Sequence, residues 1–114
     1  MEKQSRRDAV RAYKERPSVP GVFSVICRPT GETWVAASPA VDVSRNGLWF
    51  GLRVGNHQNR ALQAAWREHG EPAFDHAVLE RNTDEELSRL GRDLWLKERT
   101  AHWLGALGAR PLFG

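Results

Sequence analysis

The segment at residues 21–36 constrains the fold more than any other part of the chain. Two short apolar runs, 22–26 and 33–36, are rich in β-branched and aromatic residues. The turn-forming sequence Pro-Thr-Gly-Glu stands between them at 29–32. Strand-forming residues on both sides of a glycine-containing turn predict a β-hairpin. We therefore expect the other segments to pack around a small sheet.

Helices are predicted on both sides of this hairpin. Ser5, as a cap, would begin a basic N-terminal helix that Pro17 ends. A second helix is expected from its cap Asp42 to Leu52, and a third helix would end at Gly70.

The last part of the chain predicts one strand and one long helix. Partial alternation of apolar and polar residues at 74–79 indicates a third strand. Thr83 and Glu86 have the spacing of a capping box and would begin the long helix. The apolar face of that helix would contain Leu87, Leu90, Leu94 and Ala101.

These elements follow one another in the order α-β-β-α-α-β-α. The order predicts an α/β (α+β) fold, in which a small three-stranded, mainly antiparallel sheet is flanked by helices. The length of 114 residues favours a single domain. Within it, residues 1–19 would form a helical extension and residues 20–107 the core.

The composition is that of an ordinary globular protein. Hydrophobic residues make up 40% and charged residues 27% of the chain, which argues against disorder. The one cysteine, Cys27, excludes an intramolecular disulfide and a cysteine-based metal cluster. Residues 1–17 lack the apolar core of a signal peptide, and no run reaches membrane-spanning length, so we expect a cytoplasmic protein. The net charge of +3 is compatible with a nucleic-acid partner without requiring one.

Arg45 and Glu98 occupy positions where the helical pattern calls for apolar residues. At about 100° per residue, Arg45 shares a stripe with Leu48 and Leu52, and Glu98 lies about 20° from Leu87. An unpaired charge in a core costs several kcal/mol, so such groups are paired or solvated. Two interpretations stay open. In the first, Arg45 and Glu98 form a partly buried ion pair, or one of them extends to the rim of the core. In the second, they line a cleft where the carboxylate holds a cation and the arginine faces a phosphate.

Other basic residues are weaker candidates for nucleic-acid contacts. Arg6 and Arg7 belong to the N-terminal helix, whose basic face is either solvated or bound to phosphates. Arg53 and His57 flank the helix end expected at Gly55, and capping of the following helix explains His57 equally well.

Over residues 20–107 the chain resembles the GIY-YIG nuclease family. Gly21-Val22-Phe23 stands where that family has its first tripeptide, and Trp34-Val35-Ala36 stands where it has the second. The blocks at 52–59 and 62–66 are similar to those of small bacterial members. The same holds for His69-Gly70 followed by Phe74 and 78–80.

The resemblance implies the fold given above and a metal-dependent endonuclease, a phosphodiester hydrolase acting on DNA. By this resemblance Glu98 would bind Mg²⁺ or Mn²⁺, the one cofactor implied. Arg45 would face the phosphate, although it lies one position later than the family's usual spacing. Phe23 and Trp34 replace the motif tyrosines, which in the family supply the general base and arrange the attacking water.

These two replacements change the chemistry that the resemblance implies. A phenyl ring has no ionisable proton and an indole only donates one, so neither Phe23 nor Trp34 can act as a base. Two hypotheses follow. One is a nuclease with lowered activity, in which Arg45, Glu98, Phe23 and Trp34 form the catalytic site; the other is a non-catalytic module that binds nucleic acid or protein.

Overall fold

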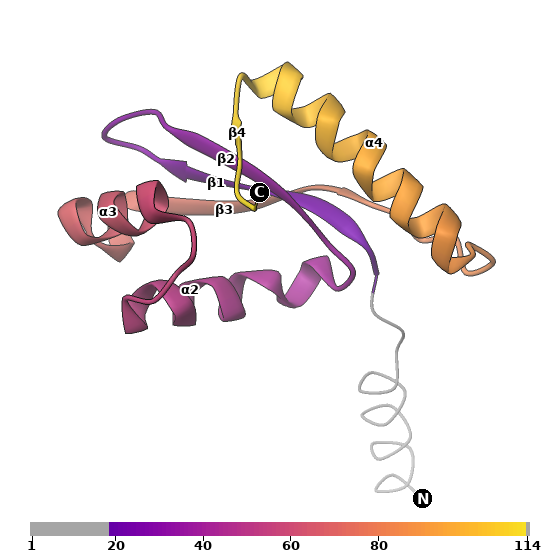
Figure 1. The fold of residues 1–114 in the computed structure, drawn as a ribbon, viewed down its shortest axis with the longest axis horizontal. Helices are drawn as coiled ribbons and strands as arrows, with labels where there is room; N and C mark the ends of the chain where they lie inside the picture. The colour runs from indigo at the N-terminus through magenta and orange to yellow at the C-terminus, as the bar shows by residue number, and fades with distance from the viewer. Residues whose placement is uncertain (1–18, 114) are drawn as a thin grey trace, which may run out of the picture.

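The computed structural model describes residues 19–113, which form a four-stranded sheet between two layers of helices (Figure 1). The predicted N-terminal helix, with Arg6 and Arg7, lies outside the described residues. None of the helices in the described part is long and apolar enough to cross a membrane. The elements are β1 (Gly21–Cys27), β2 (Thr33–Ser38), the 3-10 turn η1 (Val41–Val43), α2 (Ser44–Val54), α3 (Arg60–His69), η2 (Glu71–Ala73), β3 (Phe74–Arg81), α4 (Arg89–Leu107) and β4 (Arg110–Pro111).

The predicted hairpin is confirmed as β1 and β2, which pair antiparallel with Val25 opposite Trp34. Gly31 ends the turn with a φ of 76°, a conformation that favours glycine. Its N–H donates to the carbonyl oxygen of Cys27 at 2.8 Å, and the N–H of Cys27 donates to Glu32 at 2.9 Å. These bonds close the hairpin at the predicted place.

The sheet has the order β3-β1-β2-β4, and three of its strands are antiparallel, as predicted. The sequence did not predict β4, which pairs parallel with β2 through Arg110 and Pro111. The buried Leu112 continues this contact, because its N–H donates to the carbonyl oxygen of Val35 at 3.0 Å. The sheet therefore has four strands where three were expected. The fourth was missed because a strand of two residues is too short to show alternation of apolar and polar residues.

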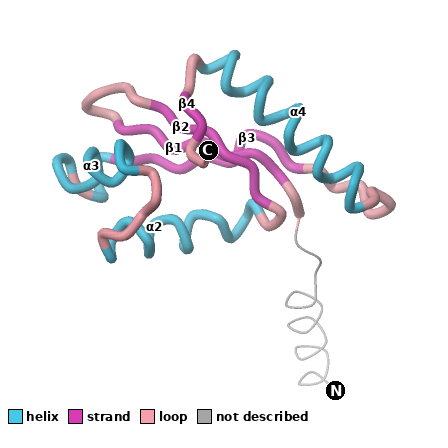
Figure 2. The backbone as a smooth tube through the Cα atoms, viewed as in Figure 1, coloured by secondary structure: helices cyan, strands magenta, loops and turns pink. Residues whose placement is uncertain are grey.

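Alternation along β1 sends its side chains to two different layers. Phe23 and Val25 belong to the main core cluster, which α2 and α3 cover, whereas Val22 and Ser24 are buried outside that cluster. The secondary-structure view shows α2 and α3 on one side of the sheet and α4 on the other (Figure 2). The sheet therefore separates α2 from α4.

The glycine stops expected after α2 and α3 are confirmed, but α2 extends two residues beyond the predicted Leu52, and its start differs from the prediction. Gly55 ends α2 in the left-handed conformation with a φ of 82°, and Gly70 follows α3. Asp42 is not a cap: it lies in η1, and its carboxylate accepts a hydrogen bond from Arg81 at 2.8 Å. The ion pair with β3 thus outcompetes the capping role predicted for Asp42.

The long helix α4 begins six residues later than its predicted cap, so the capping box at Thr83 and Glu86 is wrong. Asn82 and Asp84 instead accept hydrogen bonds from backbone N–H groups two residues further on. These turns keep the segment out of the helix. Ser88 is the true cap, since its side chain accepts from the N–H of Gly91 at 3.0 Å.

The buried face of α4 also differs from the prediction. Leu90 and Leu94 are 69% and 58% exposed, whereas Leu96 is buried. The helix contacts the sheet side through Leu96 together with Arg99 and Trp103, which make polar contacts there. A face that mixes apolar and charged residues does not stand out in a count of hydrophobic periodicity.

Candidate functional site

A cavity of about 370 Å³ lies where the end of β2 and the start of α2 meet the C-terminal segment. No Asp, Glu, Lys or Arg from the described part of the chain lines it. Its walls are formed by Phe23, Ala37, Ser38, Pro39, Ser44, Gly47, Leu48, His57 and Phe113.

Aromatic rings from distant parts of the chain meet at this cavity. Phe23 is buried on β1 and stacks on His76 of β3, with ring centroids 4.9 Å apart. On the other side, His57 stacks on Phe113 with centroids 6.0 Å apart and an angle of 29° between the rings. The cavity thus has apolar, planar walls with few polar groups between them.

Two polar side chains, one in α3 and one at its N-terminal cap, hold the loop and the C-terminal segment that form this wall. Gln63 is buried, accepts from the N–H of His57 at 3.1 Å, and donates to the carbonyl oxygen of Leu52 at 3.0 Å. Asn59 caps α3, and its Nδ2 donates to the carbonyl oxygen of Leu112 at 3.0 Å. These bonds fix the backbone next to both His57 and Phe113.

His57 presents a hydrogen-bond donor rather than a base. Burial lowers the pKa of His57, so the ring is neutral at about pH 7. Its Nδ1 accepts a hydrogen bond from the N–H of Asn59 at 2.9 Å. The proton of the neutral ring is therefore on Nε2, which can donate but has no lone pair to accept a proton.

A second histidine, His76, contacts Phe23 and Ser44 of the cavity wall and was not among the predicted site residues. The hydroxyl of Ser44 donates to the carbonyl oxygen of Val41 at 2.6 Å, and its oxygen lies 3.3 Å from Nε2 of His76. Because the hydroxyl has only one proton, Nε2 of His76 is the donor in this contact. Burial, and then the charge of Arg45, lower the pKa of His76. His76 is two residues from Phe74 on the predicted strand, so both side chains point to the same face of the sheet. This spacing could have predicted that His76 faces the core.

Of the residues predicted to form the site, the structure brings only Phe23 and His57 to one cavity. Trp34 is 1% exposed and packs in the core without lining the cavity. Arg45 stands next to Ser44 and is exposed, with its Cζ 5.8 Å from the ring centroid of Trp49.

The prediction that Arg45 and Glu98 occupy core positions is wrong, because both side chains are exposed. No ion pair joins them in residues 19–113, and the sheet lies between α2, which carries Arg45, and α4, which carries Glu98 (Figure 1). The partly buried ion pair is therefore ruled out.

Arg53 is engaged elsewhere. Its guanidinium forms two hydrogen bonds to the carboxylate of Glu71, at 2.6 and 2.9 Å. These bonds raise the pKa of Arg53 and lower the pKa of Glu71. The pair joins α2 to η2 and partly neutralises the charge that was expected to contact nucleic acid.

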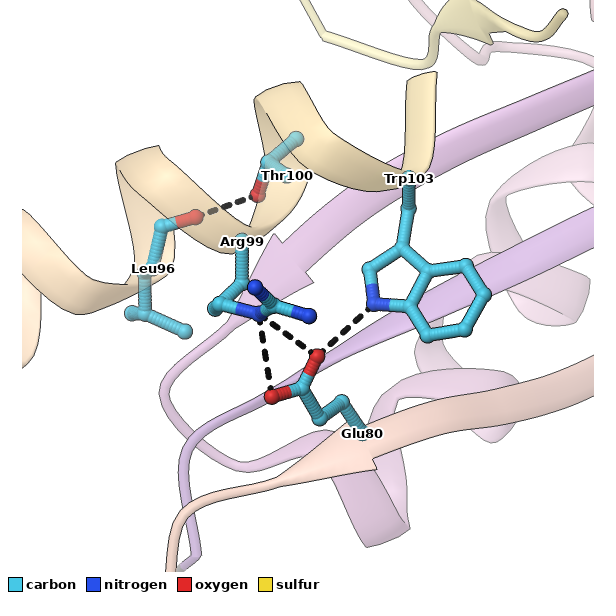
Figure 3. A network of polar contacts seen from close by, with 5 residues as sticks. All are labelled: Glu80, Leu96, Arg99, Thr100 and Trp103. Carbon is cyan, nitrogen blue, oxygen red and sulfur yellow. Dashed lines mark hydrogen bonds and ion pairs between the residues drawn. The ribbon is translucent and has the colours of Figure 1, made fainter. Parts of the chain in front are cut away.

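A polar network on the opposite side of the sheet was not predicted. Figure 3 shows the carboxylate of Glu80 between Arg99 and Trp103 of α4, which donate to it at 2.8 Å each. A bulge near Val22 shifts the register of β3 and turns Glu80 toward α4. Desolvation would raise the pKa of Glu80, but the hydrogen bonds from Trp103 and Arg99 outweigh it and lower the pKa. This network fastens α4 to the sheet.

A divalent cation of the kind that the resemblance implies does not fit the donor groups at the cavity. Mg²⁺ and Mn²⁺ favour several oxygen ligands, carboxylates above all. The described lining offers two hydroxyls and an imidazole, and residues 19–113 contain no group of three His, Cys, Asp or Glu side chains that could hold a metal. Glu98 as a metal ligand stays a prediction.

Comparison with known proteins relates this arrangement to two solved structures. One is the catalytic domain of the homing endonuclease I-TevI, with a TM-score of 0.66, 19% identity, and 83% of this chain and 99% of the other covered. The other is a mutant catalytic domain of the intron endonuclease I-TevI, with a TM-score of 0.64, 21% identity, and coverages of 79% and 84%. No protein-family model and no curated protein matches the chain.

The likeness extends over most of both chains and includes the mixed sheet flanked by helices. At 19–21% sequence identity, this likeness shows a shared fold and nothing further. I-TevI is a GIY-YIG homing endonuclease, and the chain thus has a GIY-YIG-like fold.

Proposed function

We propose that this chain is a DNA-binding domain with a nuclease-like fold that cleaves DNA slowly or not at all. The observation that carries the proposal is the chemistry of the cavity. Among residues 19–113, its lining offers hydrogen-bond donors from serine and histidine, but no carboxylate and no group with a free lone pair suited to take a proton.

The lack of a base bears directly on hydrolysis. Phe23 stands at the cavity with a phenyl ring, and the Nδ1 lone pair of His57 is occupied by the N–H of Asn59. General-base catalysis contributes on the order of 10²–10⁴ in rate, and a site without a base loses that factor. Binding by contrast needs only shape, donors and positive charge.

The distribution of charge favours a polyanionic partner on the cavity side. Residues 44–69, which form α2, α3 and their connection, contain four arginines and one acidic residue. Residues 82–107, on the α4 side, contain five acidic and four basic residues. Arg45 and Arg60 are exposed on the basic side and could contact phosphates.

A second candidate, a divalent-metal-dependent endonuclease, is favoured by the likeness to catalytic domains. In this candidate Glu98 would hold Mg²⁺ or Mn²⁺, Arg45 would face the phosphate, and Phe23 and Trp34 would line the site. Arg45 belongs to α2 and Glu98 to α4, on opposite sides of the sheet, and this arrangement supports the first candidate more than the second.

One experiment separates the two candidates. Purified protein is incubated with supercoiled plasmid in Mg²⁺ or Mn²⁺, and binding to a labelled duplex is measured in parallel by gel shift. Binding without cleavage is the expected result. Cleavage that disappears in Glu98→Ala but persists in the neighbouring Lys97→Ala would overturn the proposal in favour of the endonuclease.

The binding itself has a matched control. Arg45→Ala and Arg60→Ala should weaken the gel shift, whereas Arg89→Ala removes the same charge from α4 and should leave it unchanged. Equal losses in all three variants, or no gel shift in the wild type, would contradict a DNA-binding surface on the cavity side.

A further inference from the structure

We infer that the cavity between β2, α2 and Phe113 receives an unpaired nucleobase, while the phosphates of the strand stay outside it. This inference rests on the proposed function, since it names the part of DNA that the cavity takes. The argument uses the charge, the aromatic walls and the polar groups of the cavity.

The lack of positive charge in the described lining disfavours binding of a phosphate inside the cavity. Moving an anion out of water is costly unless a cation pairs with it. No Lys or Arg from residues 19–113 lines the cavity, and Arg45 stands outside it beside Ser44. A neutral base can enter without this cost, and the phosphate next to it would then lie near Arg45.

The aromatic groups provide a stacking surface. Phe113 is 49% exposed and lines the cavity while its ring contacts His57, so part of the ring is accessible to a stacking partner. Bases stack on such rings with little dependence on sequence. A cavity of about 370 Å³ also has the size of a small-ligand pocket and can take a single base.

The polar groups match the edge of a pyrimidine. Ser38 accepts a hydrogen bond from the N–H of Ala40 at 3.1 Å, so its own proton stays available to donate. His57 offers a second donor at Nε2, because Nδ1 is occupied. Thymine carries two carbonyl acceptors, to which two such donors can bind.

The test compares two strands of equal charge by fluorescence anisotropy at one salt concentration. One is labelled oligothymidine, and the other is an abasic strand of the same length and phosphate number. The wild type should bind oligothymidine about tenfold more tightly, the gain expected for stacking of a base. Phe113→Ala should reduce binding of oligothymidine to the abasic level, and Phe113→Trp should retain the preference.

Phe50→Ala is the matched control, because Phe50 is an exposed ring on α2 that does not line the cavity. It should leave the preference unchanged. Phe113→Leu keeps an apolar side chain without a ring and should lose the preference even if Phe113→Ala folds poorly.

The outcomes distinguish this inference from the proposed function. Equal binding of both strands by the wild type would overturn the base pocket and leave a phosphate-binding domain. The same loss in Phe50→Ala as in Phe113→Ala would also overturn it. No binding of either strand or of a duplex would overturn both.

Discussion

At Gly21 the first strand comes too close to its neighbours for a side chain. A Cβ there would collide with the carbonyl oxygen of Glu80 and stand 2.7 Å from Cγ1 of Val41. A backbone oxygen in a sheet cannot move aside easily. The glycine at the start of the first tripeptide is therefore a requirement of strand packing, independent of any chemistry.

Gly21→Ala should accordingly destabilise the fold by about 1–3 kcal/mol, the usual cost of overpacking. The control is Gly105→Ala in α4, where nothing lies within 4 Å of an added Cβ. There the change should stabilise by about 0.5–1 kcal/mol, because alanine favours a helix. Urea denaturation measures both, and equal midpoints for Gly21→Ala and the wild type would contradict the packing argument.

His76 and His57 should make stability depend on pH. Burial lowers the pKa of both rings in the folded state. In the unfolded chain they protonate near pH 6.5, so the unfolded state binds more protons as the pH falls below about 6.5. The stability contributed by the neutral rings is thus complete above that pH and is lost below it.

We therefore expect the urea midpoint of the wild type to fall between about pH 7.5 and about pH 5.5. His76→Phe keeps a ring to stack on Phe23 and should show a smaller fall. Identical pH profiles for the two proteins would show that His76 does not contribute.

At the scale of elements, Asn59 connects α3 to the C-terminal segment. Its Oδ1 accepts from the N–H of Leu62, and its Nδ2 donates to the carbonyl oxygen of Leu112. Asn59→Asp keeps the first bond and removes the second. In hydrogen exchange, we expect faster exchange at the amide of Leu112, with the amide of Leu62 still protected. Unchanged protection of Leu112 would mean that pairing with β2 alone holds the segment.

The attachment of α4 depends on Glu80. Glu80→Gln leaves Arg99 without its charged partner and should cost about 1–3 kcal/mol. The pKa of Glu80 is lowered, so its contribution is present above about pH 4.5 and is lost as the pH falls below that value. The difference in urea midpoint between variant and wild type should therefore shrink at low pH, and a constant difference would contradict the ionised carboxylate.

The hairpin, α2, α3 and β3 could be predicted because each has a strong local signal, such as Gly31 in the turn or Gly55 after α2. The inward face of α4 could not. Arg99 and Trp103 face the sheet only because a bulge turns Glu80 toward them, and a bulge has no periodic signal. At the site, two of the residues singled out in the sequence, Phe23 and His57, line the cavity, while Glu98 was placed on a stripe that faces solvent.

At the scale of the whole molecule, the sheet separates the basic segment 44–69 from segment 82–107, whose charges nearly cancel. The arginines of α2 and α3 lie on the side of the sheet that carries the cavity, and the five acidic residues of segment 82–107, three of which precede α4, lie on the α4 side. A polyanion should therefore bind in one orientation, with its phosphates along the helices that border the cavity.

This orientation predicts a specific salt dependence. Each phosphate contact contributes about 0.9 to the slope of log affinity against log salt concentration on duplex DNA. The double variant Arg45→Ala with Arg60→Ala should therefore lower the slope by about 2. Arg89→Ala with Arg92→Ala removes the same charge from α4 and should leave the slope unchanged, as measured by anisotropy at several salt concentrations. If both pairs lower the slope equally, the attraction comes from net charge alone and the layered arrangement does not orient the strand.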